Sequence, residues 1–151
     1  MNGGCYTDLK RKALFAVNVI VPLTIGLLIY LTKAESTYVS DMYASVFPRL
    51  PVISYPEVIR KYACDFLWAY SLFFCLKLVL GDPLKGDHDI TVITVTGIAA
   101  IILEVIQISG RIPGTFDPWD IVTEMAAIAV ALLITKIIER RFTHYEEKNI
   151  T

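Results

Sequence analysis

Residues 13–32 read ALFAVNVIVPLTIGLLIYLT, an apolar run without a formal charge. A helix needs about 20 predominantly apolar residues to cross a hydrocarbon core of about 30 Å, and this run meets that length. Asn18, Pro22 and Gly26 interrupt it, but neighbouring helices can satisfy the backbone groups that a proline frees. The run therefore predicts a membrane-spanning helix.

Three further windows have the same character, over residues 63–80, 90–108 and 120–138. With 55% hydrophobic residues in 151 and a mean hydropathy of +0.56, the chain is too apolar for an ordinary soluble core of this size. We therefore expect an all-α membrane protein, a four-transmembrane-helix bundle that forms a single domain over residues 1–151. A long outer loop should join spans one and two, with a short helix around residues 37–47.

The start of the chain permits a second interpretation. Lys10, Arg11 and Lys12 precede the first apolar run, as in the basic region of a cleaved signal peptide, and residues 32–34 form a weak cleavage-like site. The apolar run is longer than the roughly 7–15 residues typical of such peptides, which favours a retained first span.

Charge and cysteine content exclude several functions. The net charge is −1, so the chain has no basic surplus with which to bind nucleic acid. The three cysteines lack both CxxC spacing and a nearby histidine, which argues against a disulfide framework or a zinc site. We expect no metal and no cofactor.

Basic residues predict the orientation in the membrane. Nine of the 14 Lys and Arg residues fall on the side of the N-terminus, and they are Lys10, Arg11, Lys12, Lys77, Lys85, Lys136, Arg140, Arg141 and Lys148. The other five are Lys33, Arg49, Arg60, Lys61 and Arg111. By the positive-inside rule, this multi-pass protein of the cytoplasmic membrane should have both termini in the cytoplasm. Lys77 and Lys136 would then end spans two and four, where we expect them to snorkel to the headgroups.

Carboxylates recur near the predicted outer ends of three spans. Asp65 lies near the start of span two, Glu104 near the end of span three, and Asp120 and Glu124 at the start of span four. At a rise of 1.5 Å per residue, each should lie within about 6 Å of the outer end of its span. Lipid cannot satisfy such groups, so they should face each other or a wet cavity open to the outside.

Some of these polar residues also have a purely structural interpretation. Asp117 followed by Pro118 is typical of a helix start, with Asp117 as the N-cap. Arg111 is equally suited to binding lipid headgroups at the interface. Glu104 and Glu124 are harder to explain in this way, because an acid inside a span costs up to about 2.5–3.5 kcal/mol.

Span four also has a run of small residues, which permits close helix approach within the bundle or between protomers. These residues are Ala126, Ala127, Ala129 and Ala131. The sequence leaves the oligomeric state open.

Three segments resemble one protein family. They are DFLWAYSL at residues 65–72, EVIQ at 104–107 and RIPGTFDPWDI at 111–121. Together, over residues 62–131, they resemble the VanZ-like family of small bacterial membrane proteins. The resemblance implies a cell-envelope role and low-level resistance to the glycopeptide teicoplanin. The positions that match recurring family elements are Glu104, Gln107, Arg111, Asp117 and Asp120.

Our leading hypothesis is an outward-facing acidic pocket with Arg111 that binds a cell-envelope ligand such as a lipid headgroup, a wall precursor or a glycopeptide. Arg111 would contact an anionic group, while Asp65, Glu104 and Glu124 would shape the pocket and hold Gln107 and Arg111. Because several acids share this space, we expect at least one to be protonated at neutral pH.

Two other classes remain open from the sequence. In a membrane enzyme, Asp65 or Glu124 would be a general base toward a lipid-linked substrate, although no nucleophile–base pair identifies catalytic residues. In a small proton-coupled transporter, the carboxylates would carry protons. Transporters commonly have more spans and paired discontinuous helices, so a bundle of four short spans argues against this class.

Overall fold

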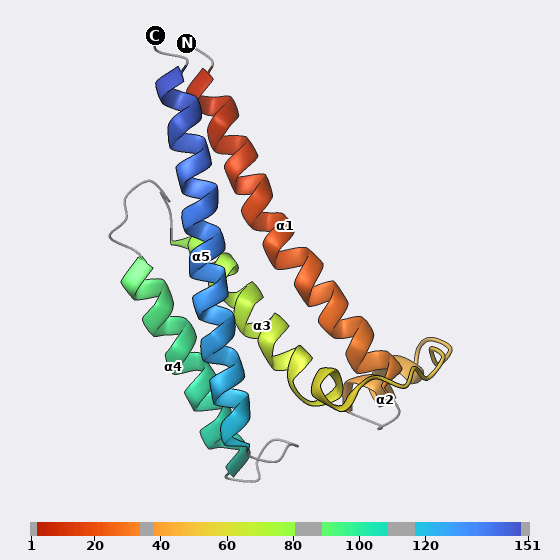
Figure 1. Ribbon diagram of the computed structural model, residues 1–151. Helices are drawn as coiled ribbons and strands as arrows, with labels where there is room; N and C mark the ends of the chain where they lie inside the picture. The colour runs from red at the N-terminus through yellow and green to blue at the C-terminus, as the bar shows by residue number, and fades with distance from the viewer. Residues whose placement is uncertain (1–2, 34–37, 81–88, 109–116, 149–151) are drawn as a thin grey trace.

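The computed structural model describes residues 3–33, 38–80, 89–108 and 117–148, and every regular element within them is a helix. The helices are α1 (Gly3–Thr32), α2 (Tyr38–Ala44), α3 (Glu57–Val79), α4 (Asp89–Ile108) and α5 (Pro118–Lys148). Figure 1 shows α1, α3, α4 and α5 as a bundle, with α2 lying beside the end of α1.

Within the residues that the structure describes, four helices are long and apolar enough to cross a membrane, which confirms the predicted fold class. The qualifying segments are Asp8–Thr32, Glu57–Val79, Asp89–Ile108 and Pro118–Phe142. They contain the windows predicted at 13–32, 90–108 and 120–138, and the window at 63–80 except for its last residue, Leu80, which caps α3. The short helix expected at residues 37–47 is observed as α2.

Several helices continue beyond the windows that the sequence predicts. α1 begins at Gly3 and α5 ends at Lys148, so both extend past the apolar windows at the end of the bundle where the two termini lie (Figure 1). α3 begins directly after Pro56, six residues before its predicted start. Asp65 is therefore about 12 Å along α3 rather than within 6 Å of its start.

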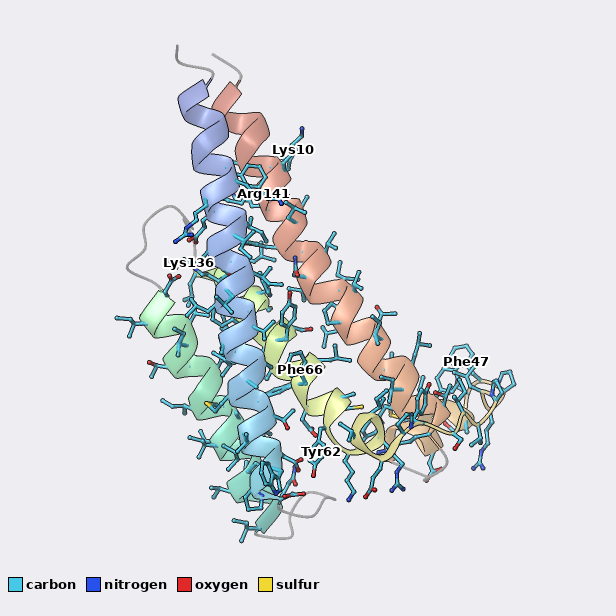
Figure 2. All side chains as sticks on the ribbon, viewed as in Figure 1. Lys10, Phe47, Tyr62, Phe66, Lys136 and Arg141 are labelled. Carbon is cyan, nitrogen blue, oxygen red and sulfur yellow. The ribbon has the colours of Figure 1, made fainter. Side chains whose placement is uncertain are left out.

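The helices alternate in direction, so the bundle has two distinct ends. We call the end that carries both termini the terminal end, and the end where α3 and α5 begin and α4 finishes the acidic end (Figure 1). Lys10 and Arg141 lie toward the terminal end, whereas Tyr62 lies toward the acidic end (Figure 2). α3 is central, because α1, α4 and α5 all pack against it.

Aromatic residues of α3 form much of the core. Phe74 packs against Phe15 of α1, with ring centroids 5.5 Å apart, and against Tyr70 and Phe73 of its own helix at 5.0 and 5.8 Å. The Tyr70 hydroxyl also donates a hydrogen bond of 2.5 Å to the Asn18 side-chain oxygen. Asn18, which interrupts the first apolar run, therefore connects α1 to α3.

The small residues of α5 face in two directions. Ala127 and Ala131, one helical turn apart, are fully buried, while Ala126 and Ala129 are exposed on the bundle surface. Close helix approach inside the bundle therefore uses only Ala127 and Ala131.

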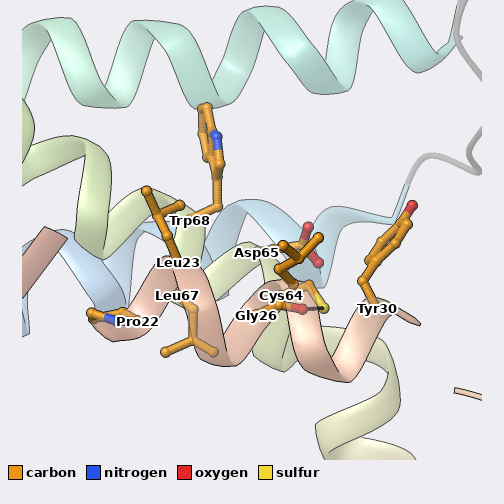
Figure 3. Close-up of a pocket in the computed structure, with 9 residues that line it drawn as sticks. Pro22, Leu23, Gly26, Tyr30, Cys64, Asp65, Leu67 and Trp68 are labelled. Carbon is orange, nitrogen blue, oxygen red and sulfur yellow. Dashed lines mark hydrogen bonds between the residues drawn. The ribbon is translucent and has the colours of Figure 1, made fainter. Parts of the chain in front are cut away.

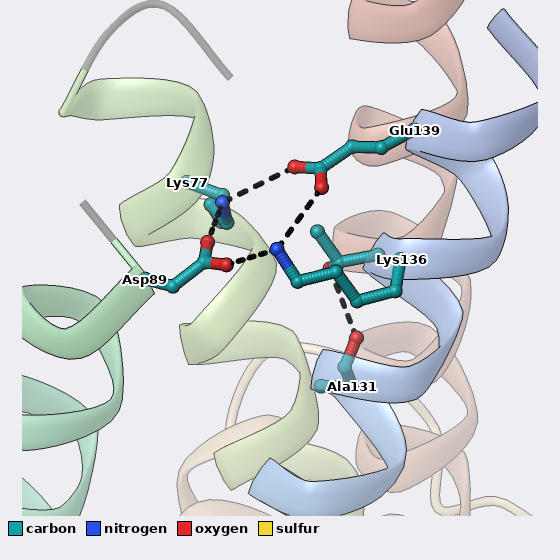
Figure 4. A network of polar contacts seen from close by, with 6 residues as sticks. Lys77, Asp89, Ala131, Lys136 and Glu139 are labelled. Atoms are coloured by element: carbon teal, nitrogen blue, oxygen red, sulfur yellow. Dashed lines mark hydrogen bonds and ion pairs between the residues drawn. The ribbon is translucent and has the colours of Figure 1, made fainter. Parts of the chain in front are cut away.

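The prediction that Lys77 extends its side chain to the headgroups is wrong. Its side chain is only 3% exposed and forms ion pairs with Asp89 of α4 and Glu139 of α5 (Figure 4). Lys136, which is half-exposed, pairs with the same two acids at 2.5 and 3.3 Å. Two cations and two anions thus join α3, α4 and α5 near the terminal end. Hydropathy alone does not reveal this network, because Asp89 lies just outside the predicted third span.

Candidate acidic site

Carboxylates from three helices gather at the acidic end. Asp65 of α3 interacts electrostatically with Asp120 of α5 and Glu104 of α4. Glu124, one turn beyond Asp120 on α5, interacts with all three of these acids. We call Asp65, Glu104, Asp120 and Glu124 the acidic cluster. The convergence that helix geometry predicts for these four residues is observed.

Two members of the cluster are almost completely buried and incompletely paired. Glu104 is 4% exposed and Glu124 is 3% exposed. The Oε2 atom of each has no hydrogen-bond partner within the part of the chain that the structure describes. A buried polar atom without a partner is unfavourable and uncommon in native proteins, so these two oxygens need an explanation.

The helices explain why these side chains meet. Asp120 and Glu124 are four residues apart and therefore lie on one face of α5. Glu104 reaches the same level from the last turn of α4, where its carboxylate accepts a hydrogen bond from the Asp117 backbone. α4 and α5 both pack on α3, which positions Asp65 against this face.

Lys33 is a cation close enough to act on the cluster. It follows the last residue of α1 and interacts electrostatically with Asp65. Its ammonium nitrogen lies 4.3 Å from the centroid of the Tyr30 ring. Among the described residues, no ion pair reaches Glu104 or Glu124, so Lys33 acts at the edge of the cluster and not on its two most buried acids.

The remaining predicted site residues have different outcomes. Asp117 caps α5, because its carboxylate accepts a 3.0 Å hydrogen bond from the Trp119 backbone N–H, and the capping interpretation is confirmed. Gln107, half-buried, lies three residues beyond Glu104 on α4. Arg111 lies outside the described residues, so its predicted contacts with the acids stay a prediction.

An apolar cavity adjoins the cluster, and it could not be predicted from the sequence. It has a volume of about 310 Å³, is open to the surface, and lies between α1 and α3 (Figure 3). Its lining residues are Pro22, Leu23, Gly26, Leu27, Tyr30, Cys64, Asp65, Leu67 and Trp68. Asp65 belongs both to the cavity wall and to the acidic cluster. Periodicity identifies which faces are apolar but not where two apolar faces leave space between them.

The arrangement suits the binding of a polar or charged group. Within the described ranges, no three His, Cys, Asp or Glu residues are placed to hold a metal ion. The four carboxylates offer several acceptor oxygens in a poorly solvated place, where charge-assisted hydrogen bonds are strong.

Comparisons with protein-family models, with curated proteins and with solved structures found no match to this chain.

Proposed function

We propose that the chain is a multi-pass membrane protein that binds a cell-envelope ligand at the acidic cluster. The resemblance of three segments to the VanZ-like family suggests the setting, namely the bacterial cytoplasmic membrane and tolerance of teicoplanin-type glycopeptides. In this proposal the acidic cluster faces the outside, and Arg111 adds a contact to an anionic part of the ligand.

The observation that carries the proposal is the burial of Glu104 and Glu124 with one unpartnered oxygen each. An intramembrane acid is costly, and an orphaned one adds the loss of a hydrogen bond. A purely structural pair would be expected to find partners, as Lys77 and Asp89 do at the other end of the bundle. Acids that bind a ligand have oxygens that are unpaired without the ligand and accept hydrogen bonds from it when it is bound.

The test uses Glu104→Gln and Glu124→Gln, which keep side-chain shape and remove the charge. Glu57→Gln is the matched control, because Glu57 lies at the same end, is exposed, and pairs with the neighbouring Lys61 at 2.7 Å. We expect each buried variant to reduce teicoplanin tolerance of a bacterial host to that of cells without the chain. Glu57→Gln should retain full tolerance at equal membrane abundance.

Binding is measured in parallel on the purified protein in nanodiscs, with teicoplanin as the probe. Both buried variants should weaken binding at least tenfold, whereas the control should not change it. Full tolerance and full binding in both buried variants would exclude the acidic cluster as the site.

Proton-coupled transport is the alternative that a specific observation favours, because buried carboxylates with free oxygens are also suited to carrying protons. Proteoliposomes loaded with a pH-sensitive dye distinguish the two. A transporter would move protons when its substrate is added, and Glu124→Gln would stop this movement. A binding protein would show no such flux.

A further inference from the structure

We infer that the ligand of this site is a single-chain amphiphile with a protonated amine head, whose apolar chain occupies the cavity between α1 and α3 and whose head binds the acidic cluster. This inference rests on the proposed function and specifies its ligand class.

The first argument is the continuity of the two features. Asp65 lines the apolar cavity and also interacts with Asp120, Glu104 and Glu124. A molecule in the cavity that reaches Asp65 is therefore next to the other three carboxylates. The remaining walls of the cavity come from aliphatic and aromatic side chains, a thiol and a glycine, which suit a hydrocarbon chain.

The second argument is charge complementarity. Four carboxylates lie at one end of the site. Among the described residues, the cation Lys33 acts on Asp65 at the edge of the acidic cluster. The unpartnered Oε2 atoms of Glu104 and Glu124 can accept hydrogen bonds but cannot donate them when ionised. An ammonium group offers three donors and a positive charge, so it satisfies both requirements.

The third argument is location and size. The cavity lies beside residues 22–30 of α1, in the part of that span nearest the acidic end, and it is open to the surface of the bundle. An amphiphile resting in the membrane has its head near this level and can enter from the lipid. A volume of about 310 Å³ is at the lower limit for ligand pockets, which favours one chain over a two-chain lipid.

The cysteines provide a direct test. Cys64 lines the cavity and its thiol contacts the Gly26 carbonyl at 3.7 Å, while Cys75 lies on the exposed surface of α3. With Cys5 replaced by Ala, removing Cys75 leaves the cavity thiol, and removing Cys64 leaves the surface thiol as the matched control. Both proteins are studied as full chains in a neutral detergent.

The first measurement compares a cationic and an anionic thiosulfonate reagent of similar size. We expect the cationic-to-anionic rate ratio at Cys64 to exceed that at Cys75 at least tenfold. The ratio at Cys64 should fall severalfold in Glu104→Gln and in Glu124→Gln but not in Glu57→Gln. Equal ratios at the two thiols would overturn the inference, because the cavity would then not sense the carboxylates.

The second measurement uses dodecylamine and dodecanol as probes at equal concentration. Dodecylamine should slow Cys64 modification by an uncharged maleimide at least fivefold, and Glu124→Gln should abolish this protection. Equal protection by dodecanol, or protection that survives Glu124→Gln, would show a merely apolar cavity and overturn the inference. Loss of teicoplanin tolerance in Glu124→Gln together with no amine preference would leave the proposed function standing and remove this ligand class alone.

Discussion

At the scale of single residues, Lys77 has the clearest energetic consequence. Its ammonium group is buried and lies between Asp89 and Glu139, so removing it leaves two acids with Lys136 as their remaining partner in the network. Breaking a buried ion pair by removing one partner costs about 3–5 kcal/mol, because the other charge loses its compensation. We expect Lys77→Met to lower the free energy of unfolding by about that amount, measured by detergent denaturation followed by circular dichroism.

Lys136→Met is the control, since Lys136 is half-exposed and its loss leaves Lys77 between the same acids. We expect it to cost about 1 kcal/mol or less. Adding Asp89→Asn to Lys77→Met should restore part of the stability. Equal losses for the two lysine variants would contradict the account of the network.

A second prediction concerns the hydrogen bond that joins α1 to α3. Tyr70 donates to Asn18 at 2.5 Å, and interhelical hydrogen bonds in membranes contribute about 0.6–1.7 kcal/mol. A double-mutant cycle of Tyr70→Phe and Asn18→Ala should give a coupling free energy in that range. Strictly additive single effects would show that the two side chains do not stabilise each other.

The acids of the candidate site could be predicted residue by residue, whereas the lysine network could not. Asp65, Glu104 and Glu124 are recognisable because a charge within an apolar helix is itself unusual. Lys77 is equally unusual, but a long side chain near a helix end has a second explanation in snorkelling. Only the packing of α3 against α4 and α5 shows that Asp89 and Glu139 lie within its reach.

At the scale of elements, hydropathy locates the apolar, membrane-spanning part of each helix but not the ends of the helix. Residues 57–62 include Glu57, Arg60 and Lys61, so they fall outside any apolar window although they belong to α3. Beyond the membrane, helix length is no longer tied to apolar composition. The spans are therefore predictable from the sequence, but the true helix ends are not.

Gly26 permits a prediction about how α1 and α3 pack. A Cβ atom added at this position would lie 3.7 Å from Leu67 Cβ, which is an ordinary contact. Gly26→Ala should therefore keep the free energy of unfolding within about 1 kcal/mol of the parent, because the better helix propensity of alanine offsets small adjustments. Gly26→Trp must displace Leu67, and overpacking of this kind costs about 1–3 kcal/mol.

The same two variants separate packing from access to the cavity. Gly26→Ala should leave the rate of Cys64 modification nearly unchanged. Gly26→Trp should reduce that rate severalfold, because its side chain would fill the cavity that Gly26 and Cys64 line. Gly97→Ala on α4 is the control, since the added Cβ would meet only the flexible end of Met125 at 3.6 Å. A large loss of stability in Gly26→Ala would contradict the observed spacing of α1 and α3.

At the scale of the whole molecule, the bundle separates two kinds of charge arrangement. Near the terminal end, the charges of Lys77, Lys136, Asp89 and Glu139 compensate each other. At the acidic end, Glu104 and Glu124 keep oxygens without partners among the described residues. The first arrangement stabilises the contact of three helices. The second leaves buried acceptor atoms unpaired at a cost in stability, which is the pattern expected of a functional site.

The position of this acidic end relative to the membrane decides which ligands can reach it. The sequence predicts that it faces outward, because nine of 14 basic residues lie on the other side. In a variant without its three native cysteines, Ser54→Cys reports the acidic end and Arg140→Cys the terminal end, since both positions are exposed. An impermeant maleimide added to intact cells should label Ser54→Cys and should label Arg140→Cys only after permeabilisation. The reverse pattern would place the acidic cluster toward the cytoplasm, where an extracellular glycopeptide cannot reach it, and the ligand would then have to come from the inner leaflet or the cytoplasm.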